Sequence, residues 1–139
     1  MTIKSPTQTY TYDPETEPEL SGAQVAKLLD FPAPKLATYV SSPERWLTFL
    51  PNQQATGPGR YRYYSMADVL TIAMLIDTSA DLSQTLSIEF RRTLASEIRN
   101  RLLVPGPVQG TVSATVGRVR VTYEPRWDLL AVDPDSLFD

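Results

Sequence analysis

The sequence contains neither cysteine nor histidine among its 139 residues. Without thiols it has no disulfide framework and no thiolate metal site. Without imidazole it lacks the Ser-His-Asp and Cys-His machinery of many hydrolases, and also the commonest zinc ligand. A carboxylate-based or lysine-based enzyme remains open, but no acidic pair stands beside a plausible nucleophile. We therefore expect a protein that is not an enzyme and that holds no metal and no cofactor.

Long apolar runs are also missing. No stretch approaches the ~18 apolar residues that a membrane span needs, and residues 1–20 contain no apolar stretch resembling a signal peptide. The length fits one domain large enough to bury a core. We expect a cytoplasmic protein without a membrane partner.

Negative charge dominates only at the two ends of the chain. The formal net charge is −3. Residues 20–101 nevertheless hold nine basic and seven acidic side chains, a net charge of +2, and the excess of acidic residues lies in 1–19 and 102–139. The acidic total therefore does not exclude a polyanionic partner, but binding to one would depend on a local patch.

Two short helices are predicted after a polar N-terminal segment. Residues 1–19 show no apolar periodicity and are expected to form a flexible acidic arm unless they dock on a partner. Ser21 and Gln24 form a capping-box pattern at the start of the first helix, which ends at Asp30, a residue type that tolerates the left-handed conformation. Pro34 suits the first position of a second helix. Such a pair is a candidate for a helix-turn-helix, and on these residues alone it fits an ordinary helical hairpin inside a core equally well.

A third helical piece and a wing are predicted next. The segment 41–50 is expected to be helical, with Ser42 as cap, Pro43 at its start, and three apolar side chains facing inward: Trp46, Leu47 and Leu50. In "GRYRYYSMADV", residues 59–69, arginines alternate with tyrosines after a run of turn formers, which favours a short hairpin or wing. Ser65 and Asp68 then repeat the capping pattern before an apolar helix that we expect at the centre of the core.

The remaining sequence predicts a long helix and a hairpin. Apolar residues recur at spacings of four and indicate a helix of about five turns: Leu82, Leu86, Phe90, Leu94, Ile98 and Leu102. Four arginines lie off this stripe, either as a solvated face or as a second cationic surface: Arg91, Arg92, Arg99 and Arg101. The alternating pattern of 112–123 around Gly117 indicates a β-hairpin.

Residues 20–82 resemble the MerR-like winged helix-turn-helix, which is shared by MerR regulators, phage excisionases and some antitoxin DNA-binding domains. The resemblance is carried by "QVAKLL", residues 24–29, in the first helix and by the wing-to-helix pattern "R-x-Y-S-x-x-D-V". That second pattern is matched by Arg62, Tyr64, Ser65, Asp68 and Val69. Ala37 and Thr38 stand where the family usually has a basic pair.

The resemblance implies a mainly α fold with small β elements. A winged helix-turn-helix and a long helix would occupy 20–103, and a β-hairpin with an acidic tail would occupy 108–139. Phosphate contacts would come from the wing, through Arg60 and Arg62, unless these arginines merely solvate a turn. Tyr64 would either donate its hydroxyl to a phosphate or anchor the wing to the core. The second helix would contribute Lys35 and Thr38, together with the neighbouring Ser41 and Ser42.

We expect a sequence-specific protein that binds double-stranded DNA, either a small transcriptional regulator or a mobile-element accessory factor. It would act as a homodimer through the helix in 83–103 or through the C-terminal hairpin, because one module with few cations binds weakly. The alternative is an antitoxin or adaptor whose C-terminal segment binds a protein such as a toxin through Trp127, Leu130 and Phe138. These apolar side chains would otherwise dock on their own domain.

Overall fold

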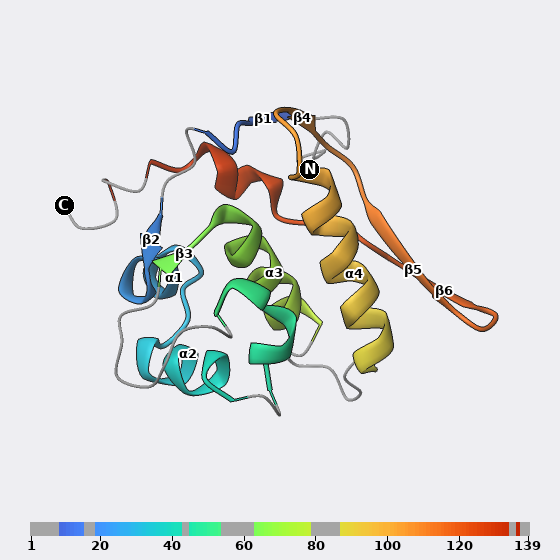
Figure 1. Cartoon of the computed structure of the whole chain (residues 1–139), viewed down its shortest axis with the longest axis horizontal. Helices are drawn as coiled ribbons and strands as arrows, with labels where there is room; N and C mark the ends of the chain where they lie inside the picture. The colour runs from blue at the N-terminus through green and yellow to red at the C-terminus, as the bar shows by residue number, and fades with distance from the viewer. Residues whose placement is uncertain are drawn as a thin grey trace, which may run out of the picture.

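The computed structural model describes residues 9–15, 19–42, 45–53, 63–78, 87–133 and 136. Within these residues the fold is mixed, with four α-helices and three two-stranded sheets (Figure 1). The helices are α1 (Gly22–Leu28), α2 (Ala33–Val40), α3 (Met66–Asp77) and α4 (Ile88–Arg101). The strands are β1 (Tyr10–Tyr12), β2 (Leu20–Ser21), β3 (Tyr63–Tyr64), β4 (Gly106–Val108), β5 (Val112–Val116) and β6 (Val119–Tyr123). The expected helices with small β elements and the C-terminal hairpin are confirmed.

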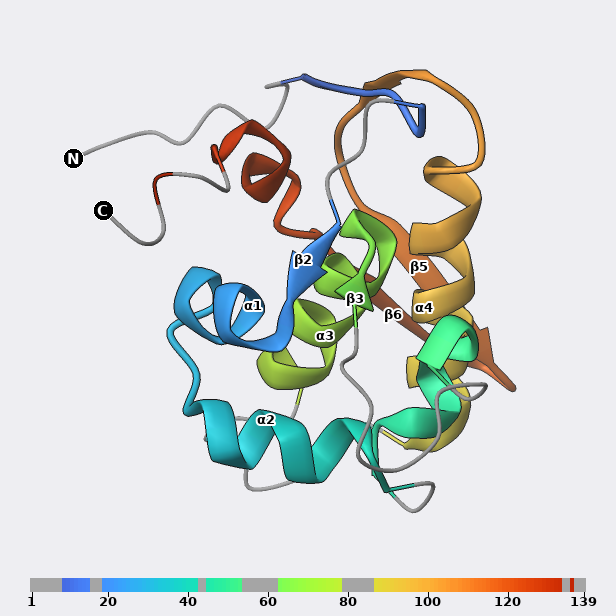
Figure 2. The same cartoon turned by 60° about the vertical axis from the view of Figure 1, so that its left-hand side comes forward.

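Helix α3 is the centre of the core. Every residue from Asp68 to Leu75 is buried, and the helix lies between α1 and α2 on one side and α4 on the other (Figures 1 and 2). Its start follows from the predicted capping box: the Ser65 hydroxyl accepts from the backbone N–H of Asp68, and the Asp68 carboxylate accepts from that of Ser65. None of the helices in the described part of the chain is long and apolar enough to cross a bilayer.

The first two helices form where the sequence predicts them. The capping box at α1 is present, with Ser21 Oγ accepting from the Gln24 N–H at 3.2 Å. Asp30 adopts a φ of 50°, the left-handed conformation that lets the chain turn into α2. Helix α2 begins at Ala33, so Pro34 occupies its second position rather than its first. Leu36 and Val40 are its buried residues.

The third helical piece is a pair of 3-10 turns, Leu47–Phe49 and Pro51–Gln53, instead of an α-helix. Pro51 explains the break, because it lacks an N–H and disfavours a helical conformation in the residue before it. Trp46 and Leu50 are buried as predicted, whereas Leu47 is only half-buried.

Strand β3 pairs with β2, with Leu20 opposite Tyr64 and Ser21 opposite Tyr63. This two-stranded sheet joins the residues directly ahead of α1 to those directly ahead of α3, and the two strands lie together in Figure 2. Of the hairpin or wing expected ahead of α3, Tyr63 and Tyr64 form a strand, while Arg60 and Arg62 lie outside the described residues.

Helix α4 begins at Ile88, which corrects the expected start at Leu82. Ser87 precedes it in an extended conformation, with φ −61° and ψ 158°, and serves as its N-cap residue. Leu82 and Leu86 lie outside the described residues. Three of the predicted apolar positions are buried: Leu94, Ile98 and Leu102. Strand β5 packs against α4, and Gly117 turns the hairpin with a φ of 62°.

Part of the N-terminal arm belongs to the fold. Strand β1 pairs antiparallel with β4, placing Tyr10 opposite Val108 and Tyr12 opposite Gly106. Tyr12 is buried. Backbone pairing and burial of a tyrosine thus place Tyr10–Tyr12, within the arm expected to be flexible over 1–19, on the fold, and the flexibility of the arm stays a prediction. Residues 1–8 and 16–18 lie outside the described residues.

Candidate nucleic-acid interface

Helix α2 and its C-cap residue present three of the predicted site residues to solvent. Lys35, Thr38 and Ser41 are exposed, while Leu36 and Val40 of the same segment are buried. The Thr38 hydroxyl donates to the Pro34 carbonyl at 3.0 Å, so its oxygen still has acceptor capacity. Figure 2 shows α2 along an outer edge of the molecule. The amphipathic pattern of α2 thus produces an exposed polar face on a helix whose opposite face is packed into the core.

A cluster of aromatic rings supports this face from the side. The Tyr39 and Trp46 rings meet edge to face with centroids 4.7 Å apart, and Phe31 lies 5.5 Å from Trp46. Lys35 Nζ is 5.5 Å from the Phe31 ring centroid, and the Arg45 guanidinium is 4.5 Å from the Tyr39 ring. Such distances permit cation–π attraction, which orients the two cations without neutralising them.

Arg45 is a candidate site residue that the sequence pattern did not indicate. It is exposed and lies against α2 through Tyr39. From Phe31 to Gln53 the described residues carry Lys35 and Arg45 and no carboxylate; Glu44 lies outside them. We define the α2 surface as the four exposed residues Lys35, Thr38, Ser41 and Arg45. It is a local cationic surface on a chain with an acidic total.

Tyr64 does not belong to an exposed interface. Its side chain is 2 % exposed and lies in the hydrophobic core, so it cannot reach a phosphate in this fold. Of the two roles considered for it, anchoring the strand to the core is the one observed. Its neighbour Tyr63 is exposed instead, because successive residues of a strand point to opposite faces.

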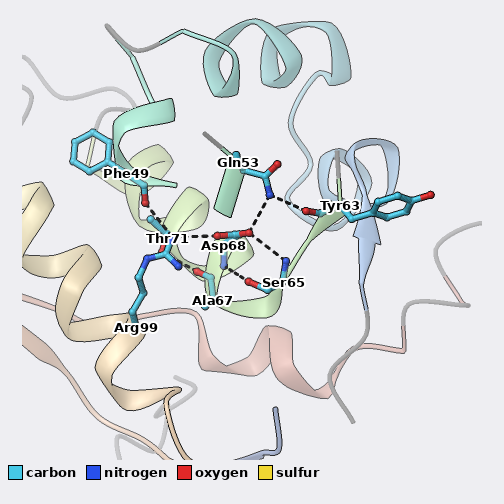
Figure 3. Close-up of polar contacts among 8 residues, drawn as sticks. All are labelled: Phe49, Gln53, Tyr63, Ser65, Ala67, Asp68, Thr71 and Arg99. Atoms are coloured by element: carbon cyan, nitrogen blue, oxygen red, sulfur yellow. Dashed lines mark hydrogen bonds and ion pairs between the residues drawn. The ribbon is translucent and has the colours of Figure 1, made fainter. Parts of the chain in front are cut away.

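A buried carboxylate holds the segments around the α2 surface together (Figure 3). Asp68 Oδ2 accepts hydrogen bonds from Gln53 Nε2 at 3.2 Å and from the Ser65 N–H at 3.3 Å. Gln53 Nε2 also donates to the Tyr63 carbonyl at 2.7 Å, which ties the 3-10 turn Pro51–Gln53 to β3. Arg99 Nη2 donates to Asp68 Oδ1 at 3.1 Å and to the Phe49 carbonyl at 3.0 Å.

Three of the four arginines of α4 hold the fold rather than form a free cationic face. Besides Arg99, Arg91 Nε donates to Thr78 Oγ1 at 3.2 Å, and burial lowers the pKa of Arg91. Arg101 donates from its two Nη atoms to the carbonyls of Gln109 and Thr111. Arg92 is exposed. Of these four arginines, Arg92 is therefore the one that can still belong to a solvated face or to a second cationic surface.

The C-terminal segment docks on its own domain. Trp127, in the 3-10 helix Trp127–Ala131, is 3 % exposed, and its Nε1 donates to the Gly110 carbonyl at 2.9 Å. The alternative role considered for Trp127, docking on its own domain, is the one seen in this chain, and partner binding through Trp127 stays a prediction. Leu130 is half-buried and packs against the core, and Phe138 lies outside the described residues.

An ion pair holds the residues that lead into the C-terminal 3-10 helix. Arg126 pairs with Asp77 at the end of α3, with Arg126 Nε 3.0 Å from Asp77 Oδ2, and the Tyr123 hydroxyl donates to the same oxygen at 2.7 Å. Burial raises the pKa of Tyr123, and its hydrogen bond to Asp77 raises it further. The hydrogen bond to Asp77 raises the pKa of Arg126.

No protein-family model matches the chain, and no curated protein or solved structure matches it significantly. In the described part of the chain, no group of three or more acidic side chains comes together in a way that could hold a metal ion. Among the described residues, the predicted site residues that are exposed therefore lie together, and they form the α2 surface.

Proposed function

We propose that this chain is a sequence-specific DNA-binding protein, a small transcriptional regulator or mobile-element accessory factor that acts as a homodimer. In this proposal residues 20–82 are a MerR-like winged helix-turn-helix, with α2 as the recognition helix. The observation that carries it is the exposed α2 surface, which has two cations and no carboxylate among the described residues from Phe31 to Gln53 and is set on a helix whose other face is buried in the core.

The chemistry of the α2 surface suits a duplex. An α-helix fits the major groove, where Lys35 would donate to guanine acceptors and the hydroxyls of Thr38 and Ser41 would meet either donors or acceptors. Arg45, held against Tyr39, would contact the phosphate backbone, as would Arg60 and Arg62. Such contacts are few, so two copies on two half-sites about 34–36 Å apart would be needed for tight binding.

The alternative function, an antitoxin or adaptor acting through its C-terminal segment, has less support. Trp127 and Leu129 are buried within the chain, and Leu130 is half-buried against the same core. The most hydrophobic part of that segment is therefore already occupied by intramolecular contacts.

Selection from a pool of random duplexes with the full-length protein tests the proposal. We expect enrichment of a motif made of two related half-sites. Lys35→Ala and Thr38→Ala should then each relax the preference for that motif and weaken binding to it, by about 1–3 kcal/mol for every base that the side chain reads. Arg92→Ala is the matched control, because it removes one exposed cation from α4 and leaves α2 intact.

Two outcomes would contradict the proposal. Enrichment of no motif by a protein that unfolds cooperatively would show that it does not read sequence. An equal loss of affinity in Arg92→Ala and Lys35→Ala would show that binding depends on net charge rather than on the α2 surface.

A further inference from the structure

Strand β6 is an open edge in the described part of the chain. Its register pairs it with β5 alone, from Val112 opposite Tyr123 to Val116 opposite Val119. The buried side chains of β5 belong to the core, whereas β6 has only exposed and half-buried residues. Figure 1 shows the hairpin projecting past α4, away from α1 and α2. An exposed strand edge is a template for pairing with another strand.

The turn determines which backbone groups face this open edge. Gly117 and Arg118 form a two-residue loop with positive φ at the glycine, as in a type II′ turn. The turn hydrogen bond makes Val116 and Val119 a hydrogen-bonded pair, and such pairs alternate along an antiparallel ladder. Val119, Val121 and Tyr123 therefore direct their N–H and C=O groups toward β5. Those of Arg120 and Thr122 face outward.

We infer that the β6 edge binds the β6 edge of a second copy of this chain, antiparallel, with Val121 opposite Val121 of the second copy. In this register Arg120 lies opposite Thr122 of the second copy, and both residues have the outward-facing groups that an antiparallel hydrogen-bonded pair needs. The two-fold symmetry repeats the contact on the other side of the axis. Two hairpins would thus form one four-stranded sheet.

In this register the side chains along β6 of one copy complement those along β6 of the second copy. Arg118, in the turn just before β6, would lie close to Glu124 of the second copy, just after its β6, so that the symmetric interface would bring opposite charges together at both ends. Val119, which is 57 % exposed, lies opposite Tyr123 of the second copy in this register, and Tyr123 is half-buried in its own chain. Aromatic–β-branched and opposite-charge cross-strand pairs both stabilise antiparallel sheets. A register centred on Arg120 would instead place Arg120 opposite itself, with like charges in contact.

This inference rests on the homodimer of the proposed function and names its interface, and it needs no DNA. Sedimentation equilibrium of the full-length protein without DNA is therefore the test. We expect a dimer for the wild type. Thr122→Pro, which removes an outward-facing N–H and leaves the ladder to β5 intact, should abolish dimerisation while leaving the far-ultraviolet circular dichroism spectrum of the folded protein unchanged.

Charge reversal tests the register. Arg118→Glu places a carboxylate close to Glu124 of the second copy at both symmetric sites, so we expect dimerisation to weaken roughly tenfold. Combining Arg118→Glu with Glu124→Arg restores both opposite-charge pairs and should recover the wild-type dimer. Arg120→Glu is the matched control, because it reverses the same charge opposite Thr122 and should have little effect.

The inference is overturned by a wild type that stays monomeric at all accessible concentrations, a result that leaves DNA binding by a monomer open. It is equally overturned by a dimer that survives both Thr122→Pro and Arg118→Glu, which would place the interface elsewhere. Greater weakening by Arg120→Glu than by Arg118→Glu would also overturn it, because a different register would then be formed.

Discussion

Asp68 and Arg99 form an ion pair where α3 packs against α4, with 3.1 Å between Asp68 Oδ1 and Arg99 Nη2. The Asp68 side chain is 1 % exposed and the Arg99 side chain 21 %. The same carboxylate completes the capping box of α3 through its other oxygen. Asp68 therefore both caps the start of α3 and holds α4 against it.

Asp68→Ala is expected to lower the free energy of unfolding by about 3–5 kcal/mol, because it leaves a largely buried guanidinium without its counter-ion. Ser65→Ala removes the other half of the same capping box and should cost only about 1 kcal/mol. Urea unfolding followed by circular dichroism measures both. Equal losses in the two variants would mean that the ion pair contributes nothing beyond the cap.

Tyr123 should make the folded state sensitive to alkaline pH. Its pKa is raised by burial and by the hydrogen bond to Asp77, so the folded state holds the phenolic proton more tightly than the unfolded state. The stabilisation is complete below the unfolded pKa of about 10 and is lost as the pH rises above it, by at most about 1.4 kcal/mol per pH unit.

Urea unfolding of the wild type and of Tyr123→Phe at about pH 9 and about pH 11 checks this. The wild type should lose more stability than the variant between the two pH values, because phenylalanine has no proton to lose. The same loss in both proteins would assign the pH dependence to other groups.

Features whose determinants lie within a few residues were predictable from the sequence. Both capping boxes, the left-handed Asp30 and the turn at Gly117 form as expected, because each depends on local backbone geometry and on side chains three residues apart or fewer. The core position of α3 followed from its strongly apolar sequence, which only Thr71 interrupts between Val69 and Ile76.

Features that depend on distant segments were missed or left open. Asp68 and Arg99 are 31 residues apart, and no periodicity links them. The spacing of leucines continues back to Leu82, but the helix begins after Ser87, whose extended backbone, with ψ 158°, interrupts the helical conformation. Burial of Tyr64 depends on pairing with β2, so the sequence allowed an exposed role as well. Arg45 was missed because only the fold brings it onto Tyr39.

Docking of the N-terminal strand should contribute to stability. Tyr12→Ala removes a buried ring next to β4 and is expected to lower the free energy of unfolding by about 3 kcal/mol, the lower end of the range for buried aromatics. Thr11→Ala on the same strand alters an exposed side chain and should change it by less than about 0.5 kcal/mol. A Tyr12→Ala variant as stable as Thr11→Ala would show that β1 is not held on the fold in solution.

Trp127 should behave as a core residue. Trp127→Ala is expected to lower the free energy of unfolding by about 3–5 kcal/mol, because it opens a cavity and leaves the Gly110 carbonyl without its donor. Asp128→Ala, which changes the exposed neighbour, is the control. If Trp127→Ala unfolds like the wild type but loses a co-purifying protein, the segment binds a partner and the antitoxin or adaptor function regains its support.

Arg60 and Arg62 lie outside the described residues. Their contribution to DNA binding can be measured in solution. If both contact phosphates, changing them together to alanine should weaken binding to all duplexes alike, because phosphates carry no sequence information. It should also make the dependence of log K on log salt about two units shallower, roughly 0.9 for each phosphate that is no longer neutralised. Arg92→Ala combined with Arg120→Ala removes the same charge from exposed positions on α4 and β6 and should leave that slope unchanged. An unchanged slope in the Arg60 and Arg62 variant as well would mean that the segment ahead of β3 does not touch DNA, and the α2 surface would then have to bind the duplex without a wing.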